Sequence, residues 1–231
     1  MLNKDSISLL KSITNITNSA LITYPITTIT SERKDILGNI DFSKVEGTGW
    51  DEFGIYDLNS FLGALAILDN PDIKQSETSL IAKDSDSSIS FVVSHPSSLE
   101  EFTTDPENIT TTCETPSVVS IDIDTTMITK IRKGVSVFKD LKDLFLVKEG
   151  DRLYFKTGNK ESFSRTQNSY EVDLTPTINS GNDFEIAILV ENFLALPAMD
   201  FTLNVKYNKE YDMYRITLEN TIYQFLLPTI E

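Results

Sequence analysis

The chain has little of the chemistry on which most enzyme and metal sites depend. Its 231 residues include one cysteine, Cys113, and one histidine, His95. A single cysteine excludes an internal disulfide and any multi-cysteine metal site, and it fits a reducing compartment. A single histidine weighs against a histidine-based zinc centre and against a Ser-His-Asp triad. We therefore expect no metal and no other cofactor.

Long hydrophobic runs and targeting signals are also missing. No apolar run approaches the roughly 18 residues that a membrane-spanning helix needs, and the opening MLNKDSISLL lacks the apolar core of a signal peptide. DSDSS (84–88) lacks the glycine and glutamate of a calcium loop, and GTGWDEFG (47–54) lacks the lysine of a phosphate-binding loop. We expect polar loops at both places, and a soluble intracellular protein with no membrane partner. Trp50, in the second loop, fits either packing or binding.

Positive charge is scarce and unevenly placed. The chain has 35 acidic and 20 basic residues, a formal charge of -15, and a pI near 4.5. Ten of the 20 bases lie between Lys130 and Arg165 beside five acids, so this window carries +5 and the remainder of the chain -20. The overall charge argues against coating nucleic acid, but it leaves room for one local basic surface.

The predicted elements follow one order twice. In each half a helix, strands, a second apolar helix and three more strands follow one another, with an offset of about 120 residues. In the first half we predict helices over 5–17 and 57–68, and strands within 20–30, 36–45, 73–77, 79–84 and 88–94. In the second half we predict a leading strand over 117–123, helices over 124–138 and around 186–196, and strands over 144–150, 152–157, 169–175, 201–207, 213–219 and 221–227. Asp5 or Ser6, Asp57 and Asp124 are the expected helix caps.

The stretch 95–116 is rich in Pro, Ser and Thr, has little apolar periodicity, and is predicted to be a connector. It divides the chain into a first domain over 1–108 and a second over 109–231. The order of elements leaves two interpretations open, a duplicated plan or two unrelated α+β domains.

The first helix of each half has an apolar face and a basic face. In the second half, Lys130, Arg132 and Lys133 lie opposite the apolar positions, with Lys139 at the flank. In the first half, Lys4 and Lys11 lie opposite the leucines and isoleucines. Neither basic face carries an acid in its middle, which suits sequence-independent contact with a phosphate backbone. The alternative is a solvated helix face with lysines by chance.

Three segments resemble the sliding clamps of T-even-type bacteriophages. IYDLNSFLGALAIL followed by IKQSE (within 55–77) is similar to their I-Y-D-L-N-x-F-L-G helix and I-x-Q-S-E strand. NKDSISLLKSI near the start is similar to their S-K-D-x-x-x-L-L-K opening, and RKG at 132–134 to an R-G in their third helix. The second half otherwise matches by length and element order.

The resemblance implies an α+β DNA clamp fold with two topologically similar domains, each with two helices packed on antiparallel sheets. Three chains would form a head-to-tail ring around double-stranded DNA, with helices lining the hole. The clamp would tether the replicative DNA polymerase as a processivity factor, be opened by an ATP-driven clamp loader, aid late transcription, and have no enzymatic activity. Its location would be the cytoplasm of the infected bacterial host.

The basic helix faces, which would line the hole of such a ring, supply the residues expected to face DNA: Lys4, Lys11, Lys130, Arg132, Lys133 and Lys139. The resemblance assigns further site residues. The subunit seam would join 88–94 of one chain to the strand near 170–174 of the next, through Ile89, Phe91, Val93, Tyr170 and Val172. Partner peptides would dock near the connector or at Phe225, Leu226, Leu227 and Pro228, for which a last core strand is the alternative.

Two other functions compete with the clamp. A virion or tail-type structural protein fits an acidic, strand-heavy chain rich in Ser and Thr. A hydrolase would need a constellation of carboxylates, and the pair Asp51 and Glu52 stands without a second polar group in its neighbourhood of the sequence.

Overall fold

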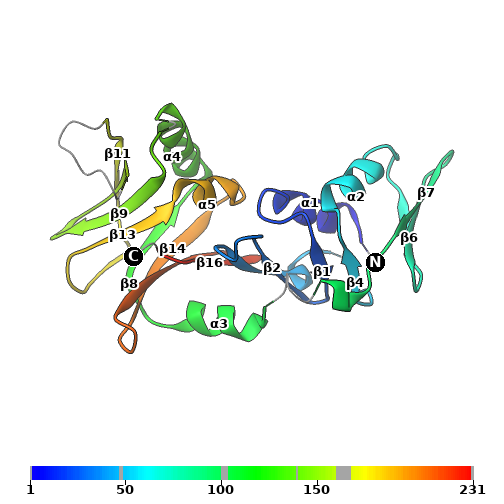
Figure 1. Cartoon of the computed structure of the whole chain (residues 1–231), viewed down its shortest axis with the longest axis horizontal. Coiled ribbons are helices and arrows are strands. Elements are labelled where there is room, and N and C mark those ends of the chain that lie inside the picture. Colours follow the sequence, from blue (N-terminus) through cyan, green and yellow to red (C-terminus); the bar gives the residue numbers. More distant parts are fainter. Residues whose placement is uncertain (1, 47–48, 100–103, 139, 160–167, 230–231) are drawn as a thin grey trace. The chain divides into compact units, whose positions relative to one another are not determined.

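The computed structural model describes residues 2–46, 49–99, 104–138, 140–159 and 168–229. They form two compact units (Figure 1). Unit 1 comprises Met1–Thr110 with Thr221–Tyr223, and unit 2 comprises Thr111–Asn220 with Gln224–Glu231.

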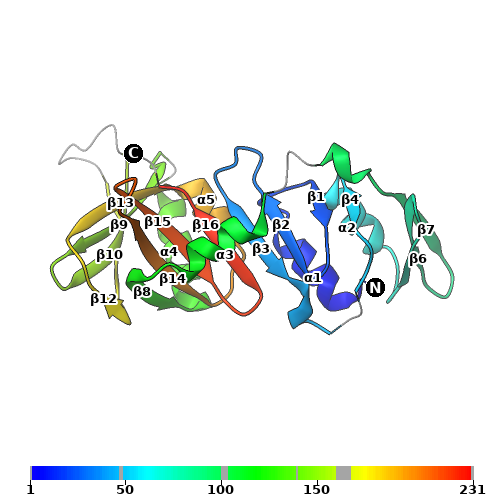
Figure 2. The same cartoon turned by 90° about the horizontal axis from the view of Figure 1, so that it is seen from below.

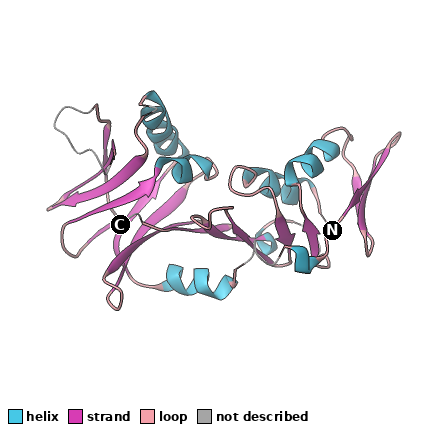
Figure 3. Ribbon diagram, in the orientation of Figure 1, coloured by secondary structure: helices cyan, strands magenta, loops and turns pink. Residues whose placement is uncertain are grey.

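Unit 1 consists of short helices and antiparallel strands (Figure 3). Its helical segments are α1 (Lys4–Ser12), the 3-10 turn η1 (Phe42–Lys44), α2 (Leu58–Leu65), the 3-10 turn η2 (Pro96–Ser98) and the first part of α3 (Pro106–Glu114). Its strands are β1 (Ala20–Ile22), β2 (Ile26–Thr30), β3 (Leu37–Asp41), β4 (Phe53–Ile55), β5 (Asp72–Gln75), β6 (Ser79–Lys83) and β7 (Ser88–Val92). Strand β1 pairs with β4, β2 pairs with β3, and β5, β6 and β7 form a sheet in that order.

Unit 2 repeats the combination with longer strands. Its helices are α4 (Thr125–Val137) and α5 (Val190–Ala195). Its strands are β8 (Ser117–Ile123), β9 (Asp143–Glu149), β10 (Arg152–Gly158), β11 (Glu171–Leu174), β12 (Ile178–Asn179), β13 (Phe184–Leu189), β14 (Phe201–Asn208), β15 (Met213–Glu219) and β16 (Tyr223–Leu227). One sheet has the order β11-β10-β9-β13, and another contains the order β12-β8-β14-β15-β16.

The helices form where the sequence supplies a cap and an apolar stripe. Asp124 accepts a hydrogen bond from the Met127 amide at 2.6 Å and so begins α4. Ile128, Ile131 and Val135 are buried on one face, and burying each contributes roughly 1.5–3 kcal/mol. The predicted helix over 124–138 is therefore confirmed.

Helix α1 is shorter than predicted. It spans Lys4–Ser12, and its cap is Asn3, whose side chain accepts from the Ser6 amide at 2.8 Å. Asp5 lies inside the first turn, where a carboxylate is favoured by the helix dipole. The predicted cap at Asp5 or Ser6 is wrong because Asn3 accepts the same kind of bond earlier in the chain.

The second apolar helix of unit 2 is only partly confirmed. The predicted segment 186–196 begins as strand β13, in which Ile186 pairs with Leu146 of β9, and becomes helical at Val190. A short apolar run can belong to either element, and pairing with β9 decides in favour of the strand here.

The connector contains a helix that the sequence pattern did not reveal. In α3, Ile109 and Cys113 are four residues apart and both buried. The ammonium group of Lys206 donates to the carbonyls of Cys113 and Thr115, both at 2.7 Å, and so satisfies the end of the helix. Burial raises the pKa of the Cys113 thiol to about 12, so it stays protonated. Figure 2 shows α3 running over the sheet that contains β14.

The cap of α2 generates a pH-dependent prediction. Asp57 accepts from both the hydroxyl and the amide of Ser60, and these bonds hold the carboxyl pKa below its usual range. A lowered folded pKa stabilises the fold above the unfolded pKa, about 3.9, and this stabilisation is lost as pH falls through the folded value. In urea unfolding, Asp57→Ala should have a lower midpoint than the parent at pH 7, and the gap should narrow below about pH 4.

The control is Asp51→Ala, at an exposed loop carboxylate, which should unfold like the parent throughout. A gap for Asp57→Ala that stays constant down to pH 2 would contradict this account of the cap.

Candidate nucleic-acid interface

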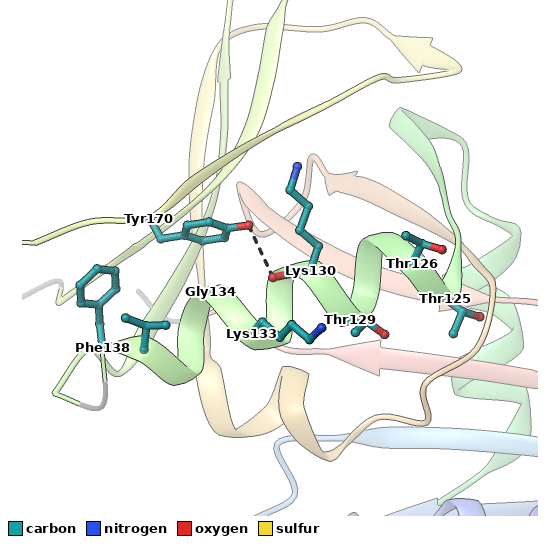
Figure 4. Close-up of a pocket in the computed structure, with 9 residues that line it drawn as sticks. Thr125, Thr126, Thr129, Lys130, Lys133, Gly134, Phe138 and Tyr170 are labelled. Carbon is teal, nitrogen blue, oxygen red and sulfur yellow. Dashed lines mark hydrogen bonds between the residues drawn. The ribbon is translucent and has the colours of Figure 1, made fainter.

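The outward face of α4 carries exposed cations. Lys130 and Lys133 are exposed, and no acid occurs among the residues of α4. Figure 4 shows the Lys130 side chain extending away from the helix. Because the opposite face is buried, these two ammonium groups are held where an anion can reach them.

Arg132 has a different environment from the lysines. It is partly buried, its guanidinium donates to the carbonyl of Leu196, and burial lowers its pKa. Its Nε is buried without a hydrogen-bond partner among the described residues. Arg132 therefore binds the carbonyl at the end of α5. The sequence pattern had predicted that it faces DNA together with the lysines.

The outward face of α1 also carries two exposed cations. Lys4 and Lys11 are exposed, while Leu9 and Leu10 are buried. Asp5 is also exposed, in the first turn. The remaining cation predicted to face DNA, Lys139, lies outside the described residues.

A groove of about 760 Å³ runs beside α4 (Figure 4). Its lining residues come from α4, from the turn after it and from the segment before β11: Thr125, Thr126, Thr129, Lys130, Lys133, Gly134, Val137, Phe138 and Tyr170. The threonines and lysines occupy the first turns of the helix, and the apolar side chains gather toward its end. The groove therefore has a basic part and an apolar part.

Tyr170 packs against α4 of its own unit. A Cβ placed on Gly134 would lie 2.1 Å from the Tyr170 ring, so only glycine permits this approach. The Tyr170 hydroxyl donates to the carbonyl of Lys130 at 3.5 Å, a long contact. Its backbone pairs with Thr157, at the end of β10. Tyr170 thus joins α4 to the start of β11. The sequence carried one signal for this contact, a glycine inside a helix, which often marks close packing.

Both strands assigned to the subunit seam lie at the edge of their sheet. Among the described strands, β7 pairs with β6 alone, and β11 pairs with β10 alone. Phe91 packs edge-on against Phe61 of α2, with ring centroids 5.1 Å apart, and Val172 is buried. Ile89 and Val93 are half-buried. These side chains pack largely inside their own units, so a seam here would be made by backbone groups and by outward residues such as Val92.

The residues proposed as a peptide pocket belong mainly to the last strand. Phe225 and Leu227 are fully buried in β16, and Phe225 lies 5.9 Å from the Phe201 ring. Leu226 is half-buried and Pro228 is exposed. The core-strand interpretation is therefore confirmed for Phe225 and Leu227.

Two further questions from the sequence are answered within the described residues. Trp50 packs between Tyr24 and Phe42, with centroid distances of 5.3 and 5.0 Å. No group of three acidic, histidine or cysteine side chains there is arranged to hold a metal ion. In the same part of the chain, no helix has both the length and the apolar character that crossing a membrane requires.

The chain is similar to solved sliding clamps. No protein-family profile and no curated protein matches the sequence. A structure of the C-terminal region of FEN-1 bound to A. fulgidus PCNA matches with a TM-score of 0.65 and 11% identity, over 97% of this chain and 94% of that chain. Proliferating cellular nuclear antigen from Entamoeba histolytica matches with a TM-score of 0.66 and 12% identity, over 97% and 94%. The beta chain of DNA polymerase III from Streptococcus pneumoniae matches with a TM-score of 0.63 and 13% identity, over 99% of this chain and 64% of that chain.

These similarities show the α+β DNA clamp fold over nearly the whole chain, which confirms the predicted fold class. At identities of 11–13% they carry no residue-by-residue assignment.

The contact between Gly134 and Tyr170 generates a double-mutant prediction. Gly134→Ala should destabilise the protein because the new methyl group meets the ring. In a Tyr170→Ala background the same change should stabilise it by up to about 1 kcal/mol, because alanine favours a helix over glycine. Urea unfolding of the four proteins measures both effects. If Gly134→Ala has the same effect in both backgrounds, the two residues are not in contact.

Proposed function

We propose that this protein is a sliding clamp, a ring of three chains that encircles duplex DNA and tethers a replicative polymerase. The observation that carries the proposal is the outward basic face of the first helix in each unit of a clamp fold. Lys4 and Lys11 on α1, and Lys130 and Lys133 on α4, are exposed while the apolar faces of these helices are buried.

A topological tether needs only a weak grip on DNA. Each lysine near a phosphate releases about one counterion and adds no information on base sequence. Four such lysines per chain hold the duplex in the opening and still let it slide. The charge of -20 outside the basic window keeps DNA from binding to the remaining surface.

Ring closure would use the two free strand edges. Strand β7 belongs to unit 1 and β11 to unit 2, so pairing between neighbouring chains joins two different surfaces. Such head-to-tail contacts close into a ring when the rotation between chains permits it.

The remaining assignments extend this proposal. The polymerase, an ATP-driven loader and late-transcription factors would bind through short peptides with apolar anchors, near the connector 95–116 or the end of β16. The protein itself would need no cofactor and catalyse no reaction. Its place would be the cytoplasm of a bacterium infected by a T-even-type phage.

Retention on circular DNA tests the proposed function. Protein loaded onto a closed circle should stay bound through a high-salt wash and leave after the circle is cut, because a ring is held by topology alone. Filtration of labelled protein with the DNA before and after cutting measures this. Equal loss from intact and cut circles would contradict the clamp.

Two matched double variants test whether DNA loading depends on the lysines of the basic helix face or on lysines anywhere on the surface. Lys130→Ala with Lys133→Ala should reduce loading several-fold and leave the trimer intact. Lys74→Ala with Lys83→Ala removes two exposed lysines from β5 and β6 and should leave loading unchanged. Loss of the trimer in the Lys130→Ala, Lys133→Ala variant would mean that these two lysines stabilise the protein's own packing and do not serve DNA binding.

A further inference from the structure

We infer that the apolar end of the groove beside α4 binds an unpaired nucleotide of DNA, with the base on the aromatic side chains and the phosphate at the lysines. The inference rests on the proposed function, which already assigns Lys130 and Lys133 to DNA. It adds the form of DNA that this part of the surface binds, namely a single strand.

The groove offers apolar and aromatic side chains as well as cations. Val137, the last residue of α4, is 70% exposed and lines the groove together with Phe138 and Tyr170. Figure 4 shows the two rings at the same end of the helix. Both aromatic residues are half-buried, so part of each ring stays accessible. Exposed apolar surface beside charge on one helix face marks contact with a ligand that has an apolar part and an anionic part.

The lysines and the apolar end lie close enough for one nucleotide to reach both. Lys130, Lys133 and Val137 follow one another at spacings of three and four residues, so they share one stripe of the helix. At roughly 1.5 Å per residue, Val137 lies about 6 Å along the helix axis from Lys133. A nucleotide with its phosphate near Lys133 can therefore place its base at the apolar end.

A paired base cannot use the apolar end of the groove. In a duplex the bases are stacked inside the double helix and present only their edges in its grooves. An unpaired base can turn outward and stack on an aromatic side chain, whichever base it is. A positively charged groove with aromatic walls is the combination with which proteins bind single strands. The duplex thus uses the lysines alone, and an unpaired nucleotide uses the lysines and the rings.

Two other surface features of the described residues lack this combination. A second groove, of about 510 Å³ in unit 1, is lined by Asp51, Glu52 and Glu77, which repel phosphate. Val92 and Ile67 are 76% and 77% exposed, but neither of them lines that groove or the one beside α4. A peptide with apolar anchors would also gain from the apolar end of the α4 groove, and measurements with DNA alone separate the two ligands.

Binding of short synthetic DNA tests the inference without a ring or a loader. A fluorescent twelve-nucleotide oligo-dT and a blunt twelve-base-pair duplex are titrated with the protein at low salt, where phosphate contacts are strongest. Fluorescence anisotropy measures both dissociation constants. Val137→Ser with Phe138→Leu should weaken binding of oligo-dT at least fivefold, the loss of about one base stack, and change duplex binding less than twofold.

The matched control is Ile178→Ser with Tyr211→Leu, which makes the same kinds of change at exposed residues of β12 and of the turn between β14 and β15. This control should bind both DNAs like the parent, whereas Lys130→Ala with Lys133→Ala should weaken both. Unchanged binding of oligo-dT by the Val137→Ser, Phe138→Leu variant, as a peptide site would give, would overturn the inference. An equal loss for both DNAs would overturn it as well.

Cross-linking of the unsubstituted protein supplies a second measurement that does not depend on the folding of a variant. A photoreactive thymine analogue within the oligo-dT should attach to Phe138 or Tyr170, as identified by mass spectrometry of the peptides, and the same analogue within the duplex should not. Attachment of the oligo-dT only to other segments would overturn the inference. Oligo-dT binding at these rings without retention on circles would refute the clamp and keep the nucleotide site. Retention without oligo-dT binding would refute the nucleotide site alone.

Discussion

Burial of the apolar stripes on the two leading helices is the constraint on which the remaining structure depends. In α4, Ile128, Ile131 and Val135 are buried against unit 2, and at roughly 1.5–3 kcal/mol each they fix which way the helix faces. An exposed lysine contributes at most about 1 kcal/mol to stability through pairing, so Lys130 and Lys133 follow the orientation that the core sets. The same holds for Lys4 and Lys11 on α1. A surface suited to DNA is thus a by-product of core packing.

A second constraint links this basic surface to the strand edges. Gly134 admits the Tyr170 ring against α4, and Tyr170 leads directly into β11. In unit 1, Phe61 and Phe91 join α2 to β7 in a comparable way. In unit 2 the basic helix is therefore attached to a strand with a free edge, whereas in unit 1 the helix attached in this way is α2, which carries no basic residue. In the proposed ring, assembly through the edge of β11 would set the position of α4, so that the subunit contact and the DNA contact would be coupled in unit 2 through Gly134 and Tyr170.

Much of the fold was predictable because local signals agreed with the tertiary structure. Asp57 and Asp124 cap the helices predicted after them, and β8 has the predicted bounds. The cap of α1 was misplaced by two or three residues through a local choice, since Asn3 accepts the bond. Two other failures occurred where a distant partner decides. Strand β13 takes its conformation from β9, and α3 is stabilised by Lys206 from β14. In the candidate site, too, local features were predictable and features that depend on distant partners were not. The exposure of four lysines follows from periodicity, whereas the bonding of Arg132 to Leu196 and the packing of Tyr170 on Gly134 depend on contacts between segments distant in sequence.

In the proposed clamp, α1 and α4 face the same duplex. A photoreactive amino acid placed at Ser8 on α1, or at Thr129 on α4, would report on this directly, with Glu210 in the turn between β14 and β15 as the reference position. All three residues are exposed. With protein loaded on circular DNA, we predict cross-links to the duplex from positions 8 and 129 and none above background from 210. Cross-linking from position 210 alone, or from only one of the two helices, would contradict the account.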